Sequence, residues 1–262
     1  MLPDERRQGI LRILEQSERG TASVPALAAA FAVSEMTIRR DLDWLQSRSW
    51  VKRVHGGALL AQAAFGDAPF DQRVDRAEPE KQSIGWAASQ WVNDGERIIL
   101  DAGTTTHQIV QHLGTRQSLT VITTAMPIAQ DLARFPQITT IVLGGLLKHG
   151  ELCTVGPLVT RELARLSADK VFLSAAGYDL SRGLTDPDIG EAEVKEAIIR
   201  AATQVILVAD SSKWGQASLA HIAPLSVVDV LITDHHLPDE AVAAIESQGI
   251  RVVRAMLPGT PL

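Results

Sequence analysis

A threonine-rich turn in the middle of the chain has the residues of an anion site. A predicted strand over residues 97–101 runs into this turn, and a helix begins near residue 104. The turn contains Asp101, Gly103, Thr104, Thr105 and Thr106. Amides at a helix start and threonine hydroxyls donate hydrogen bonds to phosphate, and glycine lets the backbone approach closely. The turn therefore predicts a phosphate site, with a threonine-capped tight turn as the alternative, and the GxxxxGK[ST] spacing of a P-loop is absent.

Further polar and cationic residues follow other predicted strands. In a parallel sheet, the loops after the strands meet at the carboxyl edge, where ligands bind. Residues in these loops, or on a helix beside them, could complete the site: Thr124, Gly144, Gly145, Asp179, Lys195 and Lys213. One lysine alone is usually a surface residue, but two lysines that converge on the threonine turn would neutralise a phosphate. Lys148, Glu151 and Cys153 lie in a glycine-bounded segment that fits an ordinary loop better than a mobile lid.

A second group of side chains could bind nucleic acid. The net charge of the chain is −6, but residues 1–60 carry nine Lys and Arg against seven Asp and Glu, a net charge of +2. The remainder carries 16 against 24, a net charge of −8. Five basic residues fall within 15 positions: Arg39, Arg40, Arg48, Lys52 and Arg53. This cluster favours contact with DNA phosphates, and a solvated helix face is the alternative.

The predicted helix over residues 34–48 separates apolar from cationic side chains. At 100° per residue, three apolar residues share the inner side: Ile38, Leu42 and Leu45. The outer side presents Met36, Thr37, Arg39 and Arg40. Arginine binds guanine bidentately or contacts phosphate, so the helix has the layout of a DNA-reading helix.

The neighbouring elements predict a winged helix-turn-helix. Helices over residues 4–18 and 23–31 precede the DNA-reading helix, and a strand over residues 51–54 leads into a glycine turn. Three residues of this wing would contact the neighbouring DNA backbone or minor groove: Lys52, Arg53 and His55.

These side chains also have simpler interpretations. Arg39 or Arg40 could pair with Asp43 on the same helix, and Asp41 could orient an arginine or be solvated. We expect His55 to be a phosphate donor or a turn residue rather than a metal ligand, because no other metal-binding residues are near it.

The rest of the chain alternates strands and helices. Seven β-branched runs are the predicted strands: 97–101, 119–123, 139–143, 170–174, 204–209, 228–233 and 250–254. Uniformly apolar strands separated by helices predict a doubly wound, mainly parallel α/β sheet covered on both faces. We therefore expect a winged helix-turn-helix over residues 1–60, a linker over 61–76 and an α/β domain over 77–262.

Composition narrows the class of protein. With 262 residues, 45% hydrophobic and 21% charged, the chain resembles an ordinary globular protein of two domains. No apolar run approaches the roughly 18 residues of a membrane span, and we expect no membrane partner. The single cysteine cannot form an internal disulfide or a cysteine-based zinc site, which fits a cytoplasmic protein. His235 and His236 are adjacent, and adjacent side chains rarely bind one ion. We therefore assign no metal or cofactor.

Two strings in the first domain resemble the signature of the DeoR family of bacterial transcriptional regulators. They are VSEMTIRRDLDWL over Val33–Leu45 and VKRVHGGA over Val51–Ala58. The resemblance implies that six residues face operator DNA: Ser34, Thr37, Arg39, Arg40, Arg53 and His55. Ser49 stands where the family usually has a glycine, which leaves the angle of the wing less defined.

The second domain resembles the sensor domain of the same family. The strings are GYDLSRGLTDPDIGEAEVKEAII over Gly177–Ile199 and ADSSKWG over Ala209–Gly215. The resemblance implies a fold like ribose-5-phosphate isomerase and the CoA-transferases, with a phosphorylated sugar as effector. By matching positions, the resemblance implies an effector site formed by these residues: Asp101, Gly103, Thr104, Thr105, Gly144, Gly145, Asp179, Lys195 and Lys213. Thr124 stands where the family commonly has asparagine, so the effector could be held differently.

The leading prediction is a transcriptional repressor of carbohydrate-metabolism genes, switched by a phosphorylated sugar and located at the nucleoid in the cytoplasm. Because one small module binds DNA weakly, we expect a homo-oligomer, a dimer or larger. The alternative is a sugar-phosphate isomerase-like enzyme with an accessory DNA module. It would need a catalytic base, for which Asp101, Asp179 and Glu193 are the candidates. The resemblance to a family used for sensing favours a regulator that is not an enzyme.

Overall fold

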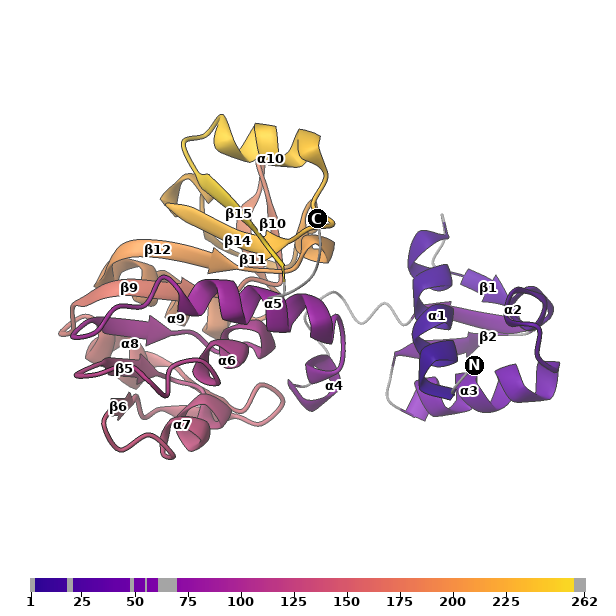
Figure 1. Cartoon of the computed structure of the whole chain (residues 1–262), viewed down its shortest axis with the longest axis horizontal. Helices are drawn as coiled ribbons and strands as arrows, with labels where there is room; N and C mark the ends of the chain where they lie inside the picture. Colours follow the sequence, from indigo (N-terminus) through magenta and orange to yellow (C-terminus); the bar gives the residue numbers. More distant parts are fainter. Residues whose placement is uncertain (1–2, 18–20, 48–49, 55, 61–69, 257–262) are drawn as a thin grey trace. The chain divides into compact units, whose positions relative to one another are not determined.

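The structure, a computed structural model, describes residues 3–17, 21–47, 50–54, 56–60 and 70–256. It divides the chain into two compact units, a head over Met1–Ala68 and a larger unit over Pro69–Leu262 (Figure 1). The predicted linker covers residues 61–76. Residues 61–69 lie outside the described residues, and the helix α4 (Phe70–Val74) lies in the remaining part.

The head is a winged helix-turn-helix, as predicted. Its helices are α1 (Pro3–Gln16), α2 (Val24–Phe31) and α3 (Glu35–Ser47). Its strands, β1 (Thr21–Ser23), β2 (Val51–Val54) and β3 (Gly57–Leu60), form an antiparallel sheet in the order β1-β3-β2. The helices enclose an apolar core that includes Ile10, Leu14, Leu27, Ile38, Leu42 and Leu45. The core fixes which side of α3 faces outward.

The larger unit is built on a seven-stranded parallel sheet in the order β15-β14-β12-β9-β4-β5-β6. The strands are β4 (Arg97–Leu100), β5 (Thr120–Thr123), β6 (Thr139–Val142), β9 (Ala168–Leu173), β12 (Ala202–Val208), β14 (Val230–Asp234) and β15 (Arg251–Ala255). All seven predicted strands are therefore present, and the predicted parallel α/β class is confirmed.

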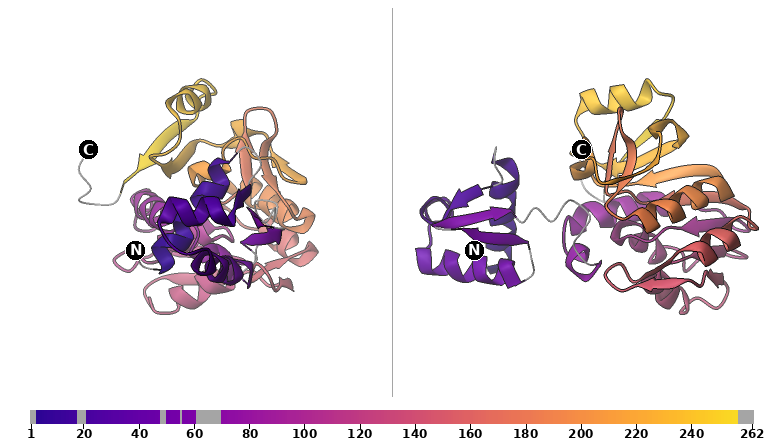
Figure 2. Two further views of the ribbon diagram at one scale, coloured as in Figure 1. Left: turned by 90° about the vertical axis from the view of Figure 1, so that its right-hand side faces the viewer. Right: turned by 180° about the vertical axis from the view of Figure 1, so that it is seen from behind.

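Helices cover both faces of this sheet (Figures 1 and 2). One apolar layer includes residues of α5 (Glu78–Ser89), α6 (Thr104–Val110) and α7 (Met126–Leu132). The other includes residues of α8 (Pro157–Leu163), α9 (Ile189–Ala201) and α10 (Asp239–Glu246). Within β4, Ile98 and Leu100 point into the first layer and Ile99 into the second, as the alternation of a strand requires. Among the described residues, no helix is long and apolar enough to cross a membrane.

Two small antiparallel structures were not predicted from the sequence. The glycine-bounded segment expected as a loop or lid forms a hairpin of β7 (Leu146–Lys148) and β8 (Cys153–Val155). A second sheet joins β10 (Gly177–Asp179), β11 (Gly183–Asp186) and β13 (Ala220–Ala223). Short 3-10 helices η1 (Ser211–Lys213) and η2 (Leu225–Val227) follow β12 and β13. The hairpin lies at the carboxyl edge of the parallel sheet, because the amide of Thr154 donates to the carbonyl of Thr124 directly after β5.

Candidate functional site

The outward face of α3 presents the cationic and apolar side chains expected to read DNA. The side chain of Met36 is 59% exposed, and Arg39 and Arg40 are both exposed. The hydroxyl of Ser34 accepts a hydrogen bond from the backbone amide of Thr37 at 3.2 Å and caps the helix, and the two hydroxyls lie 2.9 Å apart. The first turn of α3 is therefore ordered around the residues that would approach DNA.

Some arginines of the head pair with a buried carboxylate, and others pair with an exposed one. Asp41 is buried and bonds Arg6 at 2.6 Å and Arg7 at 3.0 Å, so it ties α1 to α3 and orients neither arginine of the outer face. Arg39 pairs with Glu35 at 3.1 Å on the exposed face. This partner is one turn before Arg39, whereas the sequence suggested Asp43.

The wing supplies a further exposed ion pair. Asp43 pairs with Arg53 of β2. Arg40 is exposed, and no ion pair or hydrogen bond engages its side chain within the described part of the head. Lys52 lies on β2, its side chain is not among those described, and Ser49 and His55 lie outside the described residues.

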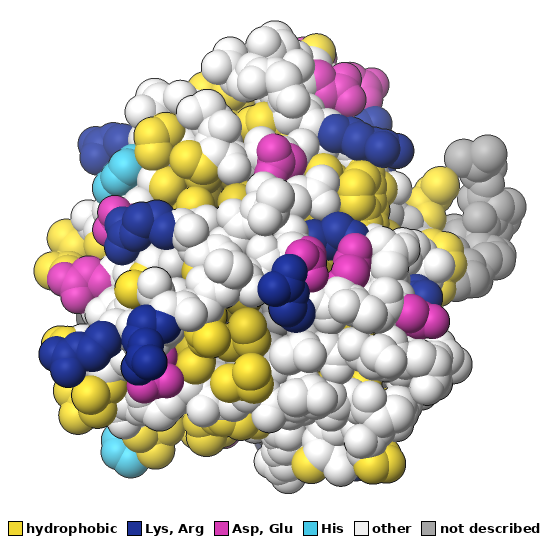
Figure 3. Space-filling view, turned by 90° about the vertical axis from the view of Figure 1, so that its left-hand side faces the viewer, with side chains coloured by type: hydrophobic (Ala, Val, Ile, Leu, Met, Phe, Trp, Pro, Cys, Tyr) yellow, Lys and Arg dark blue, Asp and Glu magenta, His cyan; other side chains and the backbone are white. Residues whose placement is uncertain are grey.

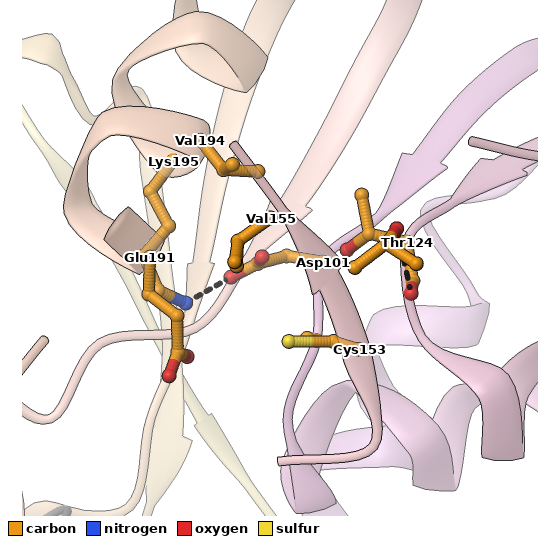
Figure 4. A pocket seen from close by; sticks show the side chains of 9 residues that line it. Asp101, Thr124, Cys153, Val155, Glu191, Val194 and Lys195 are labelled. Carbon is orange, nitrogen blue, oxygen red and sulfur yellow. Dashed lines mark hydrogen bonds and ion pairs between the residues drawn. The ribbon is translucent and has the colours of Figure 1, made fainter. Parts of the chain in front are cut away.

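A small pocket in the larger unit lies where β4, β5, β8 and α9 meet (Figure 4). Nine residues line it: Asp101, Ala102, Thr124, Cys153, Thr154, Val155, Glu191, Val194 and Lys195. Three of them were predicted from the sequence, namely Asp101, Thr124 and Lys195. The carboxyl edge of the sheet therefore brings these three together, as the parallel topology requires.

A buried ion pair lies at the centre of this pocket. The Lys195 side chain, 3% exposed, donates to Oδ2 of Asp101 at 2.6 Å and to Oγ of Ser174 at 2.9 Å. Burial alone would lower the pKa of Lys195, but the carboxylates of Asp101 and Asp186 outweigh it and raise the pKa. Lys195 is therefore a fixed positive charge that orients Asp101.

The pocket wall also contains a thiol. Burial raises the pKa of Cys153 to about 12, so the thiol is neutral and acts as an apolar wall.

The threonine turn opens α6 directly after the pocket residue Asp101. Thr104, Thr105 and Thr106 are all buried, and the Thr106 hydroxyl donates to the carbonyl of Gly103 at 2.8 Å. Within the described residues, no hydrogen bond engages the hydroxyls of Thr104 and Thr105. A Cβ at Gly103 would come within 2.9 Å of Ser174, so close packing accounts for this glycine.

Eight predicted residues lie outside the pocket lining, among them Gly144, Gly145 and Asp179. Gly144 is exposed, and a Cβ at Gly145 would come within 2.6 Å of Val159 and 2.7 Å of the Val155 carbonyl, so packing of β7 against β8 and α8 explains the second glycine. Asp179 accepts hydrogen bonds from the amides of Ser181 and Arg182 in the β10–β11 turn. Turn formation thus accounts for Asp179.

Sequence reasoning named Lys213 but missed the cationic cluster beside the pocket to which it belongs. Its members are Arg73, Arg76, Lys81 and Lys213. Lys81 is buried on α5, its amine donates to the Arg73 carbonyl, and burial lowers its pKa to about 7 although Asp210 opposes the shift. Burial also lowers the pKa of Lys213.

One pattern could have revealed this cluster. Lys81 stands at helical spacing with buried Ile84 and Ala88, and a lysine is rarely buried without a partner or a ligand.

Charged residues of the pocket interact with those of the cationic cluster through Asp186. Asp186 interacts with Lys195 on one side and Lys213 on the other. Burial raises the pKa of Asp186 to about 6 against the attraction of Lys195. Carboxylates and hydroxyls therefore line one part of the region, and basic side chains converge on the next.

Comparison with known proteins gives one family for both units. The model of the DeoR-like helix-turn-helix domain matches residues 6–64, and that of the DeoR C terminal sensor domain matches residues 76–235. The uncharacterized HTH-type transcriptional regulator YulB of Bacillus subtilis is 38% identical over 98% of both chains. GolR of Listeria innocua, an HTH-type transcriptional regulator, is 32% identical over 96% of this chain and 98% of its own. The HTH-type transcriptional repressor GlcR of Bacillus subtilis is 34% identical over 92% of both.

Solved structures are more distant. Ribose 5-phosphate isomerase A of Methanocaldococcus jannaschii is similar with a TM-score of 0.38 and 18% identity over 51% of this chain and 53% of its own. The eIF2B delta structure from Chaetomium thermophilum is similar with a TM-score of 0.41 and 14% identity over 81% and 82%. Similarity at this level says nothing of activity.

Proposed function

The chain belongs to the DeoR family of HTH-type transcriptional regulators, and on this premise we propose that a phosphorylated sugar bound to the larger unit switches the affinity of the head for operator DNA. The observation that carries the proposal is the convergence of four basic side chains beside the pocket of Asp101 and Lys195. Clustered positive charge in a partly buried site suits a phosphate dianion.

The two halves of the region suit the two halves of a sugar phosphate. The carboxylates of Asp101 and Glu191 and the hydroxyls of Thr104, Thr105 and Thr124 would bond sugar hydroxyls. Lys81, Arg73, Arg76 and Lys213 would neutralise the phosphate. Lys195 holds Asp101 in place. Thr106 and Gly103 shape the turn, whereas Gly144, Gly145 and Asp179 lie outside the pocket lining.

The head would bind operator DNA through α3 and the wing. Arg40 is the best candidate for a base contact, because it is exposed at the outward face beside Met36. Arg39 and Arg53 would exchange Glu35 and Asp43 for DNA phosphates. Ser34, Thr37, Lys52 and His55 complete the proposed contact set.

Repression is the regulatory outcome we propose, with genes of carbohydrate metabolism as the targets. GlcR and a putative aga operon transcriptional repressor of Escherichia coli O157:H7, 28% identical over 95% of this chain and 93% of its own, are both named repressors. We place the protein at the nucleoid in the cytoplasm.

A homo-oligomer of at least two chains would place two heads on symmetric half-sites. Figure 3 shows apolar side chains gathered between charged ones on one face of the larger unit. The exposed apolar residues of this unit include Ile141, Val142, Leu146, Leu158 and Ile189. Light scattering should give at least twice the 28.3 kDa of one chain, and a monomer at micromolar concentration would contradict this proposal.

The enzyme alternative is not favoured. Family and relatives are regulators by name, and the candidate bases are engaged elsewhere or lie outside the pocket lining. Asp101 is bonded by Lys195 and Ser174, Asp179 caps a turn, and Glu193 is exposed on α9.

The effector site is tested by exchanging Thr104 and Thr105 for valine, which keeps their shape and removes both hydroxyls. A thermal-shift screen of pentose and hexose phosphates should find a ligand that raises the melting temperature of the natural chain. The double variant should lose most of this rise and keep its affinity for DNA. An unchanged rise would move the sugar site away from the threonine turn.

A further inference from the structure

The first helix after the head, α4, is fixed to the rim of the proposed effector site. The amide of Phe70 donates to the carbonyl of Gly150 at 2.7 Å, and the Phe70 ring packs edge-on to that of His107 at 5.8 Å. Arg73 pairs with Glu151, and both side chains are largely buried. Four contacts of this five-residue helix, counting that of Lys81 to the Arg73 carbonyl, therefore hold it in place.

Two of the residues that hold α4, Gly150 and Glu151, belong to the hairpin that lines the pocket. Gly150 and Glu151 form its tip, and Cys153, Thr154 and Val155 of its second strand face the pocket. Leu152, between them, has a left-handed backbone at φ 52°, an unusual conformation for leucine that the surrounding contacts must hold in place. The hairpin is also tied to α9, because Lys148 pairs with Glu191 and Asp188. A ligand in the pocket would therefore press on the structure that holds α4.

Arg73 is shared between two environments. Its guanidinium pairs with Glu151, and its charge also acts on Lys81 and Lys213 of the cationic cluster. A phosphate dianion among these cations would compete with Glu151 for Arg73. Burial raises the pKa of Glu151 to about 7 although Arg73 opposes the shift, so Glu151 can be neutralised near physiological pH when Arg73 leaves.

We propose that α4 is the coupling element of this regulator, with Arg73 exchanging from Glu151 to the phosphate of the bound ligand and thereby loosening α4 from the hairpin. This inference rests on the proposed function of the larger unit, since it supplies the route by which that site acts on DNA binding. Arg73 is a positioning residue for the head and a direct contact for the phosphate.

The test uses the full chain with Glu151→Gln, which removes the charge and keeps the shape. Its matched control is Glu162→Gln, an exposed residue of the same unit. An operator fragment selected from random-sequence DNA serves as the binding probe. Glu151→Gln releases Arg73, so operator affinity without any ligand should change by about fivefold or more, the low end of typical allosteric coupling. The change should have the direction that ribose 5-phosphate, or the most stabilising sugar phosphate, produces in the natural chain.

A second measurement guards against misfolding of the variant. Hydrogen exchange of residues 70–76 in the natural chain should change on addition of the same sugar phosphate, because the Phe70 amide bond to Gly150 lies within this segment. Equal ligand-free operator affinity for Glu151→Gln and the natural chain, with unchanged exchange in α4, would overturn the inference.

The two proposals fail in different ways. If no sugar phosphate stabilises the natural chain, the proposed ligand is wrong, yet a fivefold effect of Glu151→Gln on DNA binding still supports coupling through α4. If a sugar phosphate binds and shifts operator affinity equally in the natural chain and in Glu151→Gln, the effector site stands and α4 is not the route.

Discussion

The head and the larger unit use basic side chains in opposite ways. On α3, Arg39 is exposed and pairs with an exposed Glu35, whereas in the pocket Lys195 is almost fully buried and pairs with an equally buried Asp101. The exposed pair is surrounded by water, so it contributes little to stability and can be exchanged for a DNA phosphate. The buried pair is shielded from water, so neither charge can exchange its partner for solvent. The two charges therefore fix the geometry of the site.

This difference separates a surface that binds a polyanion from a site that recognises one small anion. Exposed arginines respond to salt and to any nearby phosphate, which suits a long, uniformly charged partner. In the cationic cluster Lys81 is buried and Arg73, Arg76 and Lys213 are half-buried, so this cluster is less open to solvent than the arginines of α3. A regulator needs both kinds of site.

The largest predicted effect is on the buried pair. Lys195→Met leaves Asp101 charged and unpaired, which should reduce the free energy of unfolding of the larger unit by about 3–5 kcal/mol. Urea unfolding measures this loss. The double variant Asp101→Asn/Lys195→Met should recover part of it, since Asp101 is then neutral and only Asp186 lacks the attraction of Lys195. A loss below about 1 kcal/mol for the single variant would show that water reaches the pair and that the contrast with the head is wrong.

The next largest effect concerns the arginine that carries no partner in the described head. Arg40→Ala should weaken operator binding about tenfold or more, the low end for one bidentate base contact. Fluorescence anisotropy of a labelled operator gives the affinity, with Arg165→Ala on the surface of the larger unit as the control. Equal affinities for Arg40→Ala and the natural chain would remove Arg40 from the reading set.

A third prediction concerns pH and the cationic cluster. Because burial lowers the pKa of Lys81 to about 7, this lysine is mostly neutral at higher pH. Binding of an anion beside it then requires Lys81 to take up a proton from solution. Sulfate keeps its charge over the range, so its affinity should fall by up to about tenfold between about pH 6 and pH 8. Arg73, Arg76, Lys213 and Asp210 also face Lys81, and burial lowers the pKa of Lys213 as well.

The same lowered pKa fixes the sign for folding without a ligand. The unfolded lysine keeps its proton up to its ordinary pKa of 10.5, whereas the folded one loses it above about 7. The contribution of Lys81 to stability is therefore present above pH 10.5 and is lost as the pH falls through about 7. Lys81→Arg keeps its charge throughout, so a pH dependence of sulfate binding that persists unchanged in this variant would exclude Lys81 as the responsible group.

The smallest effect is expected at the exposed pair. Glu35→Gln frees Arg39 and removes a negative charge from the DNA-facing helix, so operator affinity should rise about twofold at low salt. The gain should vanish as salt rises, because exposed charges are screened. Affinity that falls in this variant would mean that Glu35 orients Arg39 rather than competes with DNA.

Much of the fold could be predicted from the sequence, because apolar periodicity determines which residues are buried. The spacing of Ile38, Leu42 and Leu45 gave the orientation of α3, and the seven β-branched runs gave the parallel sheet. The hairpin of β7 and β8 was missed because its strands are three residues long and its sequence is rich in glycine. Short strands carry too few alternating residues to be recognised.

Site residues could be predicted only where the order of strands along the chain determines which loops lie close together. Asp101 and Thr124 meet because parallel strands present their carboxyl ends at one edge, and α9 adds Lys195 to them. Arg73 and Glu151 are 78 residues apart and come together through a helix that lies in the predicted linker, so no local pattern joins them. Asp179 and Gly145 have the residue types of a site but serve a turn and a close packing contact.

The most direct test of the whole account is the operator affinity of the natural chain with and without the sugar phosphate that raises its melting temperature most. Anisotropy titrations should show that saturating ligand moves the midpoint of DNA binding by roughly 10- to 100-fold, which corresponds to about 1.4 to 2.7 kcal/mol of coupling. A ligand that stabilises the larger unit yet leaves this midpoint unchanged would contradict the claim that the pocket controls the head.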